Sequence, residues 1–302
     1  MAHVHILMGT FNGARWIGEQ LDSLLAQTHS NWTLWVSDDS SSDDTRAQLE
    51  EFSYRNPGRV AQILDGPRKG SAANFLHLLC HPDLPPGMVA LSDQDDVWMP
   101  HKLARAVQQL EAAGPSPYVW SARYMISTAD LKASRTSAIW ARGPSLGNAL
   151  VQNILSGHTL TLNAAALELV RSAGRQNVPH HDWWIYLVMM ACGARALVDS
   201  EIVLHYRQHS ANVLGGRTST LAQRKRLSAL MNGEMRDWIE ANLEGLRAAE
   251  CLPMTASAAE LLQRWQGHRR LDRLRLLRDL KIHRQSLKET ALLYLTAAIG
   301  KL

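Results

Sequence analysis

Hydrophobic positions in the first hundred residues follow two patterns that alternate along the chain. Short apolar runs, typical of buried strands, occupy residues 3–8, 32–37, 60–64 and 88–91. After the first run, Ile17, Leu21 and Leu24 recur at the spacing of one helix face, and helical segments also follow the later runs. Strands that alternate with helices in this way predict an α/β fold with a mostly parallel central sheet flanked by helices.

Polar motifs follow three of these predicted strands without a break. They are Gly9-Thr10, Asp38-Asp39 and Asp93-Gln94-Asp95-Asp96. The carboxyl ends of parallel strands lie along one edge of the sheet, and open α/β sheets bind their ligands at this edge. We therefore predict a nucleotide site there, with a turn and carboxylates for the base and ribose and a metal for the diphosphate.

The third motif places three carboxylates, Asp93, Asp95 and Asp96, within four residues. Like charges this close repel one another unless a cation lies among them. Mg²⁺ or Mn²⁺ would suit the position, because these hard cations take carboxylate oxygens and substrate phosphates at the same time. An acidic loop that only keeps a turn hydrated would contain the same residues, so the motif alone leaves both interpretations open.

The order of the motifs resembles a known family. The chain carries, in sequence, Thr10-Phe11-Asn12-Gly13, then Ser37-Asp38-Asp39-Ser40, then Lys69-Gly70 with Asn74, then Ser92-Asp93-Gln94-Asp95-Asp96-Val97-Trp98. Together they resemble a family-2 glycosyltransferase of the GT-A fold over residues 3 to 215. The Asp-Gln-Asp-Asp-Val-Trp form, followed by Lys102-Leu103, is most similar to bacterial rhamnosyltransferases of that family.

For the donor, the resemblance implies a nucleotide sugar, either a dTDP-sugar or a UDP-sugar. It implies that Thr10 and Asp39 contact the nucleobase, that Lys69 lies near the donor pocket, and that Asp93 faces the ribose. Gly157 corresponds to a family glycine that lets the backbone approach the donor sugar.

For the metal, the resemblance implies that Asp95 is a ligand of Mg²⁺ or Mn²⁺, and it leaves open whether Asp95 or Asp96 is the closer one. The family often carries Tyr-Arg-x-His where this chain has residues 206–209, so His209 is expected as a third metal ligand or a diphosphate contact. Arg207 would neutralise the leaving group. A zinc site that joins His209 to His180-His181 is the alternative, and it lacks the supporting cysteine or carboxylate spacing.

Asp182 is the candidate catalytic residue. It precedes an apolar helical segment, so a helix N-cap explains it. The resemblance implies instead a general base that removes the proton of the acceptor hydroxyl. The family usually has an acidic pair here, and His181 replaces its first member. Trp183 and Trp184 would form a platform for the acceptor sugar, because aromatic rings suit the apolar faces of pyranoses, although a core position would explain them equally well.

The composition is that of a globular chain of 302 residues, 46% hydrophobic and 20% charged. Its three cysteines, Cys80, Cys192 and Cys251, are far apart and lack metal spacing, which predicts reduced thiols in a reducing compartment. The start of the chain shows no secretory signal, and no apolar run approaches the roughly 18 residues of a membrane span. These features predict a cytoplasmic protein.

The charge is distributed unevenly. From Arg217 onward the chain has 16 Lys or Arg residues against 9 Asp or Glu residues, while the whole chain carries a net charge of +4. A hydrated helical appendage, a nucleic-acid patch and a membrane-surface helix are the alternatives for this basic tail. The tail lacks the aromatic interleaving of nucleic-acid modules. We therefore expect no nucleic-acid partner and favour contact with a membrane surface.

The sequence thus predicts a GT-A catalytic domain over residues 1–215 and a basic helical extension over residues 216–302. The activity that the resemblance implies is inverting, metal-dependent transfer of a sugar, L-rhamnose from dTDP-rhamnose, to a glycan or glycolipid in cell-surface polysaccharide synthesis. The expected location is the cytoplasm, with peripheral contact to the inner face of the cytoplasmic membrane. A UDP-hexose donor and a non-catalytic, nucleotide-binding relative are the alternatives left open.

Overall fold

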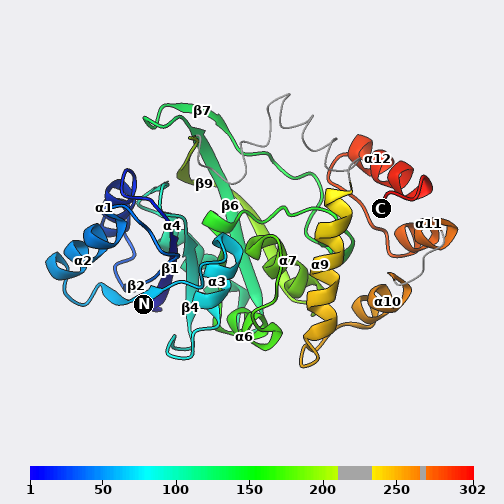
Figure 1. Cartoon of the computed structure of the whole chain (residues 1–302), viewed down its shortest axis with the longest axis horizontal. Coiled ribbons are helices and arrows are strands. Elements are labelled where there is room, and N and C mark those ends of the chain that lie inside the picture. The colour runs from blue at the N-terminus through cyan, green and yellow to red at the C-terminus, as the bar shows by residue number, and fades with distance from the viewer. Residues whose placement is uncertain (210–232, 266–269) are drawn as a thin grey trace.

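The computed structural model describes residues 1–209, 233–265 and 270–302 (Figure 1). Within these residues a nine-stranded sheet has the order β3-β2-β1-β4-β8-β6-β9-β5, and β7 pairs with β6. The strands are β1 (Val4–Thr10), β2 (Trp32–Asp38), β3 (Val60–Asp65), β4 (Met88–Ser92), β5 (Val97–Trp98), β6 (Tyr118–Ser127), β7 (Ala133–Thr136), β8 (Thr161–Leu162) and β9 (Arg195–Arg207).

The four strands predicted from the apolar runs form a parallel half-sheet. β1 pairs in parallel with both β2 and β4, and the register places Thr10 opposite Asp38 and Met8 opposite Ser92. The polar motifs that follow these strands therefore meet at one edge of the sheet, as predicted. The second half is mixed, since β8 runs antiparallel to β4 and β6, whereas β6 and β9 are parallel.

Helices cover both faces of the sheet, which confirms the predicted α/β class. Successive side chains of β1 show the two layers: Val4, Ile6 and Met8 enter one hydrophobic core and Leu7 enters the other. The first core packs under α1 (Ile17–Leu25), α2 (Thr45–Arg55) and α4 (Lys102–Ala113). The second lies under α3 (Ser71–Leu79), α6 (Ala164–Ala173) and α7 (His181–Ala191).

The C-terminal part is helical, as predicted, and it shares the second core. Its helices are α9 (Glu234–Ala248), α10 (Ala256–Trp265), α11 (Arg270–Asp279) and α12 (Leu287–Ala298). Gly245 of α9 lies so close to α7 that an added Cβ would come within 3.0 Å of the Trp184 ring. Figure 1 shows α9 beside α7, with α10, α11 and α12 beyond it. The predicted boundary between residues 215 and 216 lies outside the described residues.

Two segments in the middle of the chain contain short elements. The polar stretch 127–147 contains β7 and the start of a short helix, α5 (Leu146–Ala149). Residues 157–163 begin with a 3₁₀ turn over Gly157–Thr159 and leave only two residues for β8. The strand ends there because the Asn163 side chain accepts the Ala166 N–H and begins α6.

In the described part of the chain, no helix is long and apolar enough to cross a bilayer.

Candidate active site

The first polar motif and the second are joined by side-chain hydrogen bonds. The Thr10 hydroxyl donates to Asp38 Oδ1 at 2.8 Å, and Asp38 also accepts the hydroxyl of Ser41 at 2.6 Å. Thr10 and Asp38 are both buried, at 2% and 4% exposure. Asp38 thus shapes the turn in which Asp39 follows.

Asp39 organises the loop that carries Lys69. Its carboxylate accepts the backbone N–H groups of Arg68, at 2.5 Å, and of Gly70, at 2.8 Å. Both residues have positive φ, 58° and 83°, so the loop turns sharply and the Lys69 side chain between them is exposed. The structure therefore brings Asp39 and Lys69 together at the predicted donor edge, and their contacts with a donor remain predictions.

Gln94 is a site residue to which the sequence analysis assigned no role. Its side-chain amide accepts the Phe11 N–H and donates to the Phe11 carbonyl, each at 2.9 Å. This pair of hydrogen bonds clamps the first loop against the acidic motif. The position of Gln94 inside the motif, between the carboxylates, was the available signal.

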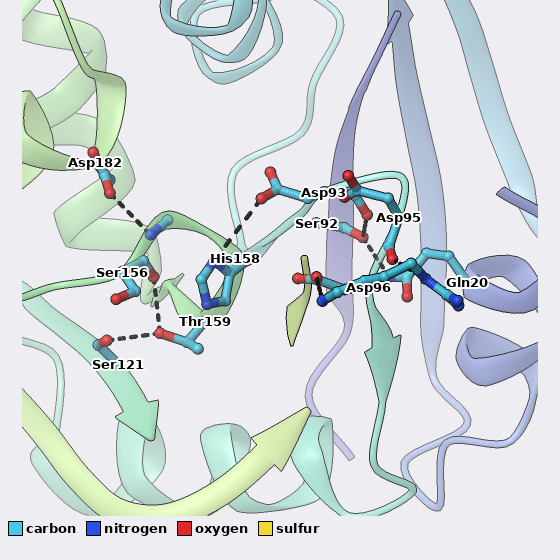
Figure 2. A network of polar contacts seen from close by, with 12 residues as sticks. Gln20, Ser92, Asp93, Asp95, Asp96, Ser121, Ser156, His158, Thr159 and Asp182 are labelled. Carbon is cyan, nitrogen blue, oxygen red and sulfur yellow. Dashed lines mark hydrogen bonds and ion pairs between the residues drawn. The ribbon is translucent and has the colours of Figure 1, made fainter. Parts of the chain in front are cut away.

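The three aspartates of the acidic motif point in different directions. Asp95 Oδ2 lies 2.7 Å from Nε2 of His209, so the two predicted metal ligands are in contact. Asp96 is fully buried; its Oδ1 accepts the Arg207 N–H, and its Oδ2 has no hydrogen-bond partner among the described residues. Asp93 Oδ2 lies 3.8 Å from Nδ1 of His158. Figure 2 shows the carboxylates around one turn, with His158 on the side of Asp93.

Two adjoining groups of side chains could hold a divalent cation. One is the predicted pair of Asp95 and His209. The other is formed by Asp93, Asp96 and His158, whose ligand atoms all lie within 4.8 Å of one another. Carboxylate oxygens combined with imidazole suit Mn²⁺ and also accept Mg²⁺. The residues present therefore fit a divalent cation, and the unpartnered Asp96 oxygen gives the second group an available ligand.

A buried lysine lies beneath these carboxylates. Lys102 is fully buried, its Nζ donates to the His158 carbonyl at 2.7 Å, and it lies 3.2 Å from the centroid of the Trp98 ring. Burial lowers the pKa of Lys102, while the charges of Asp96 and Asp93 oppose that shift. Burial raises the pKa of Asp93 to about 7, with further increases from the charges of Asp95 and Asp182. Burial also raises the pKa of Asp96.

We expect the affinity for a divalent cation to rise with pH between about 5 and 8, because a cation must displace the proton of Asp93 below its pKa of about 7. An unfolded aspartate ionises near pH 3.9, so the metal-free protein should lose stability as the pH rises from about 4 to 7. The increase in melting temperature on adding Mn²⁺ should therefore grow over this range. Thermal unfolding at fixed Mn²⁺ measures it, and an increase independent of pH would contradict a cation bound by Asp93, Asp96 and His158.

Arg207 supports the acidic turn from inside the protein. It is 1% exposed, and its guanidinium donates to the Asp95 carbonyl at 2.9 Å and to Glu19 at 2.8 Å. The same guanidinium lies 4.4 Å from the ring centroid of Trp16, on which His209 also stacks. Arg207 therefore reaches the site as predicted, but in this structure it holds the turn; a contact with the leaving group remains a prediction. Glu19 and Trp16 were not identified from the sequence.

Asp182 lies in the first turn of α7, and His180 occupies the N-cap position. The Asp182 carboxylate accepts two backbone hydrogen bonds: Oδ2 accepts the Gly157 N–H at 3.1 Å, and Oδ1 accepts the N–H of Trp183 at 2.8 Å. Figure 2 shows Asp182 and Asp93 directed toward the same segment, residues 156–159. A Cβ on Gly157 would come 2.9 Å from Nε2 of His181, so close packing against α7 already requires a glycine there.

The aromatic pair after Asp182 is core. Trp183 and Trp184 are 4% and 0% exposed, and the Trp183 indole donates to the Ala149 carbonyl at 2.6 Å. Their burial contradicts the expectation that these two rings form an acceptor platform. The reason is that α7 is covered on all sides, by α3, α5, α6, α9 and β9.

The alternative zinc site also fails among the described residues, where His180, His181 and His209 form no common metal group.

Comparisons with known proteins agree with this geometry. The sequence model of the family described as "Glycosyl transferase family 2" matches residues 5–167. The dTDP-rhamnosyl transferase RfbG of Shigella flexneri is 27% identical over 236 residues, which cover 74% of this chain and 79% of that protein.

Two solved structures share the GT-A fold with this chain. TarS of S. aureus in complex with UDP-GlcNAc has a TM-score of 0.55 at 15% identity, over 98% of this chain and 90% of that chain. The mannosyltransferase PcManGT from Pyrobaculum calidifontis, in complex with GDP-Man and Mn²⁺, has a TM-score of 0.53 at 17% identity, over 99% and 87%. At these identities the likeness concerns the fold alone.

Proposed function

The chain belongs to glycosyl transferase family 2 and is a glycosyltransferase, and from this premise we propose that it transfers L-rhamnose from dTDP-rhamnose to a hydroxyl of a glycan or glycolipid. The observation that carries the reaction is the position of Asp182. This carboxylate lies against Gly157, close enough to the acidic turn for its charge to raise the pKa of Asp93. The choice of sugar rests on the similarity to the dTDP-rhamnosyl transferase of Shigella flexneri.

In this proposal each residue has a defined task. Thr10 and Asp39 bind the base, Lys69 lies near the donor pocket, and Asp93 binds the ribose. Asp182 accepts the proton of the acceptor hydroxyl while that oxygen attacks C1 of the donor sugar from the face opposite the leaving group. The bond between C1 and the diphosphate oxygen breaks, its electrons leave with the nucleoside diphosphate, and the anomeric centre inverts.

The site also supports a role for a divalent cation. When bound by Asp95 with His209, or by Asp93, Asp96 and His158, such a cation supplies positive charge to the departing diphosphate. The Mn²⁺ of the PcManGT complex with GDP-Man supports this part of the proposal. Arg207 keeps the turn in place through the Asp95 carbonyl, so the ligands are held before the donor arrives.

We place the acceptor at a membrane surface as part of the same proposal, in cell-surface polysaccharide synthesis. On α12 and at its C-cap, the apolar side chains Leu287, Leu295 and Ile299 are 72%, 57% and 42% exposed, beside the exposed Lys288. Apolar side chains flanked by basic ones suit the inner face of a cytoplasmic membrane, where anionic lipids attract the charge.

A panel of nucleotide sugars tests the proposed donor. We expect dTDP-rhamnose with Mn²⁺ to raise the melting temperature more than UDP-glucose, UDP-GlcNAc or GDP-mannose does, and to be the donor that is slowly hydrolysed without an acceptor. Thermal unfolding and release of the nucleoside diphosphate provide the two measurements. A larger response to a UDP-hexose would overturn the choice of rhamnose, and hydrolysis of none of the donors would count against catalysis itself.

A further inference from the structure

A cavity open to solvent lies between the segment before α5 and the turn that joins α11 to α12. It has a volume of about 560 Å³, and its lining includes Arg142, Ser145, Lys281, His283, Thr290 and Tyr294. We propose that this cavity binds a phosphate or diphosphate group carried by the acceptor. The reference to an acceptor rests on the proposed glycosyl transfer, whereas the anion site itself rests on the observations that follow.

The charged side chains that line the cavity are all cationic. The lining includes the cations Arg142 and Lys281, the imidazole of His283, and no carboxylate. Neither the Arg142 guanidinium nor the Lys281 ammonium forms a hydrogen bond or an ion pair with any residue that the structure describes. By contrast, the neighbouring Arg284 is paired with Glu289. Two cations left without a protein partner, beside hydroxyl groups, suit an oxyanion with several acceptor atoms.

Lys281 has a left-handed backbone conformation that lysine seldom adopts. The Lys281 N–H donates to the Arg278 carbonyl and the Ile282 N–H donates to the Leu277 carbonyl, which is the pattern of a Schellman motif at the end of α11. Lys281 occupies the left-handed position of this motif, with φ 51°, where glycine is preferred. A lysine held in a conformation that favours glycine indicates a task for its side chain.

Polar contacts fix the two walls of the cavity to each other. The Arg142 N–H donates to Gln285 at 2.9 Å, and the Asn148 amide donates to the His283 carbonyl at 3.1 Å. A Cβ on Gly147 would come 2.8 Å from the Lys281 carbonyl, so the two segments are in close backbone contact. The cations are therefore presented by segments that are already packed together.

The cavity is joined to the proposed base through α7. The Tyr186 hydroxyl accepts the N–H of Ser145, a lining residue, at 3.0 Å, and lies 3.1 Å from Asn148 Oδ1. Tyr186 follows Asp182 by four residues, which places their Cβ atoms on one helix face, about 5–6 Å apart. Ser145, one wall of the cavity, is therefore held by the helix that also carries Asp182.

The test measures binding of inorganic diphosphate to the full chain by calorimetry in the presence of EDTA, which suppresses metal-dependent binding at the donor site. The test variant combines Arg142→Ala with Lys281→Gly, and we expect it to bind at least about 10-fold more weakly. Because glycine suits the left-handed position, Lys281→Gly alone should unfold at the same temperature as the wild type or higher. Arg275→Ala is the matched control, since it removes an exposed cation of α11 outside the cavity and should leave the affinity unchanged.

Several outcomes would overturn the anion site: no binding by the wild type in EDTA, equal binding by the double variant, or an equal loss in Arg275→Ala. Co-sedimentation with vesicles distinguishes a lipid phosphate from a sugar phosphate. The vesicles consist of phosphatidylcholine with or without phosphatidylglycerol. Loss of pelleting in the double variant supports a lipid phosphate, and unchanged pelleting with weaker diphosphate binding supports a sugar phosphate.

The glycosyl transfer can fail separately. Asp182→Asn should bind diphosphate in EDTA as the wild type does. If the double variant also binds it normally while Asp182→Asn abolishes transfer, the cavity proposal is wrong and the catalytic proposal stands. If the cavity binds diphosphate but no nucleotide sugar is turned over, the catalytic proposal is wrong and the anion site stands.

Discussion

Asparagine in place of Asp182 should reduce sugar transfer by about 10²-fold or more while donor affinity stays unchanged. The carboxylate holds two backbone N–H groups, those of Gly157 and Trp183, and an asparagine retains one acceptor oxygen for them. The loss of the other hydrogen bond should cost about 1 kcal/mol of stability, which leaves the protein folded. The asparagine amide, however, cannot accept the proton of the acceptor hydroxyl, so the loss should appear in the rate.

The measurement is initial transfer velocity at saturating donor, with calorimetry of the nucleoside diphosphate for comparison. Asp272→Asn is a matched control, because Asp272 also lies in the first turn of a helix, α11, and far along the chain from the site. Transfer within a few-fold of the wild type in Asp182→Asn would exclude this residue as the base. His181 would then be the nearest candidate, since burial holds its pKa at about 4 and keeps its imidazole neutral at pH 7.

Alanine at Asp95 should remove most of the metal-dependent part of donor binding, a loss of about 100-fold or more in affinity for dTDP measured with Mn²⁺. The expectation follows from the contact of 2.7 Å between Asp95 and His209, which brings two ligand types together. His209→Ala should cause a smaller loss in the same direction. In EDTA, both variants should bind dTDP as the wild type does.

Asp96→Asn decides between the two groups of ligands. If the cation lies with Asp93, Asp96 and His158, this change should weaken Mn²⁺-dependent binding more than Asp95→Ala does. If the cation lies with Asp95 and His209, Asp95→Ala should have the larger effect. Binding of dTDP that is equally tight with and without Mn²⁺ in the wild type would refute a metal-assisted site of either kind.

The sequence by itself determined the parallel half of the sheet and the edge at which the motifs meet. Both follow from local pattern: apolar runs identify buried strands, and the carboxyl ends of parallel strands share one edge. The strand ends that carry Thr10, Asp38 and Ser92 were therefore predicted to share one edge without knowledge of any contact, and the register of the strands confirms this. Local pattern also accounts for the burial of Trp183 and Trp184, because the continuous apolar run of α7 is typical of a helix buried on all sides.

Only the tertiary structure decided which side chains face one another across the site. Asp95 and His209 are 114 residues apart, and Arg142 and Lys281 are 139 apart, so no periodicity connects them. Their meeting depends on the register of β9 against β6 and on the packing of the C-terminal helices onto α7. Such contacts are set by the burial of whole elements, and a polar residue's own neighbours in sequence carry no information about them.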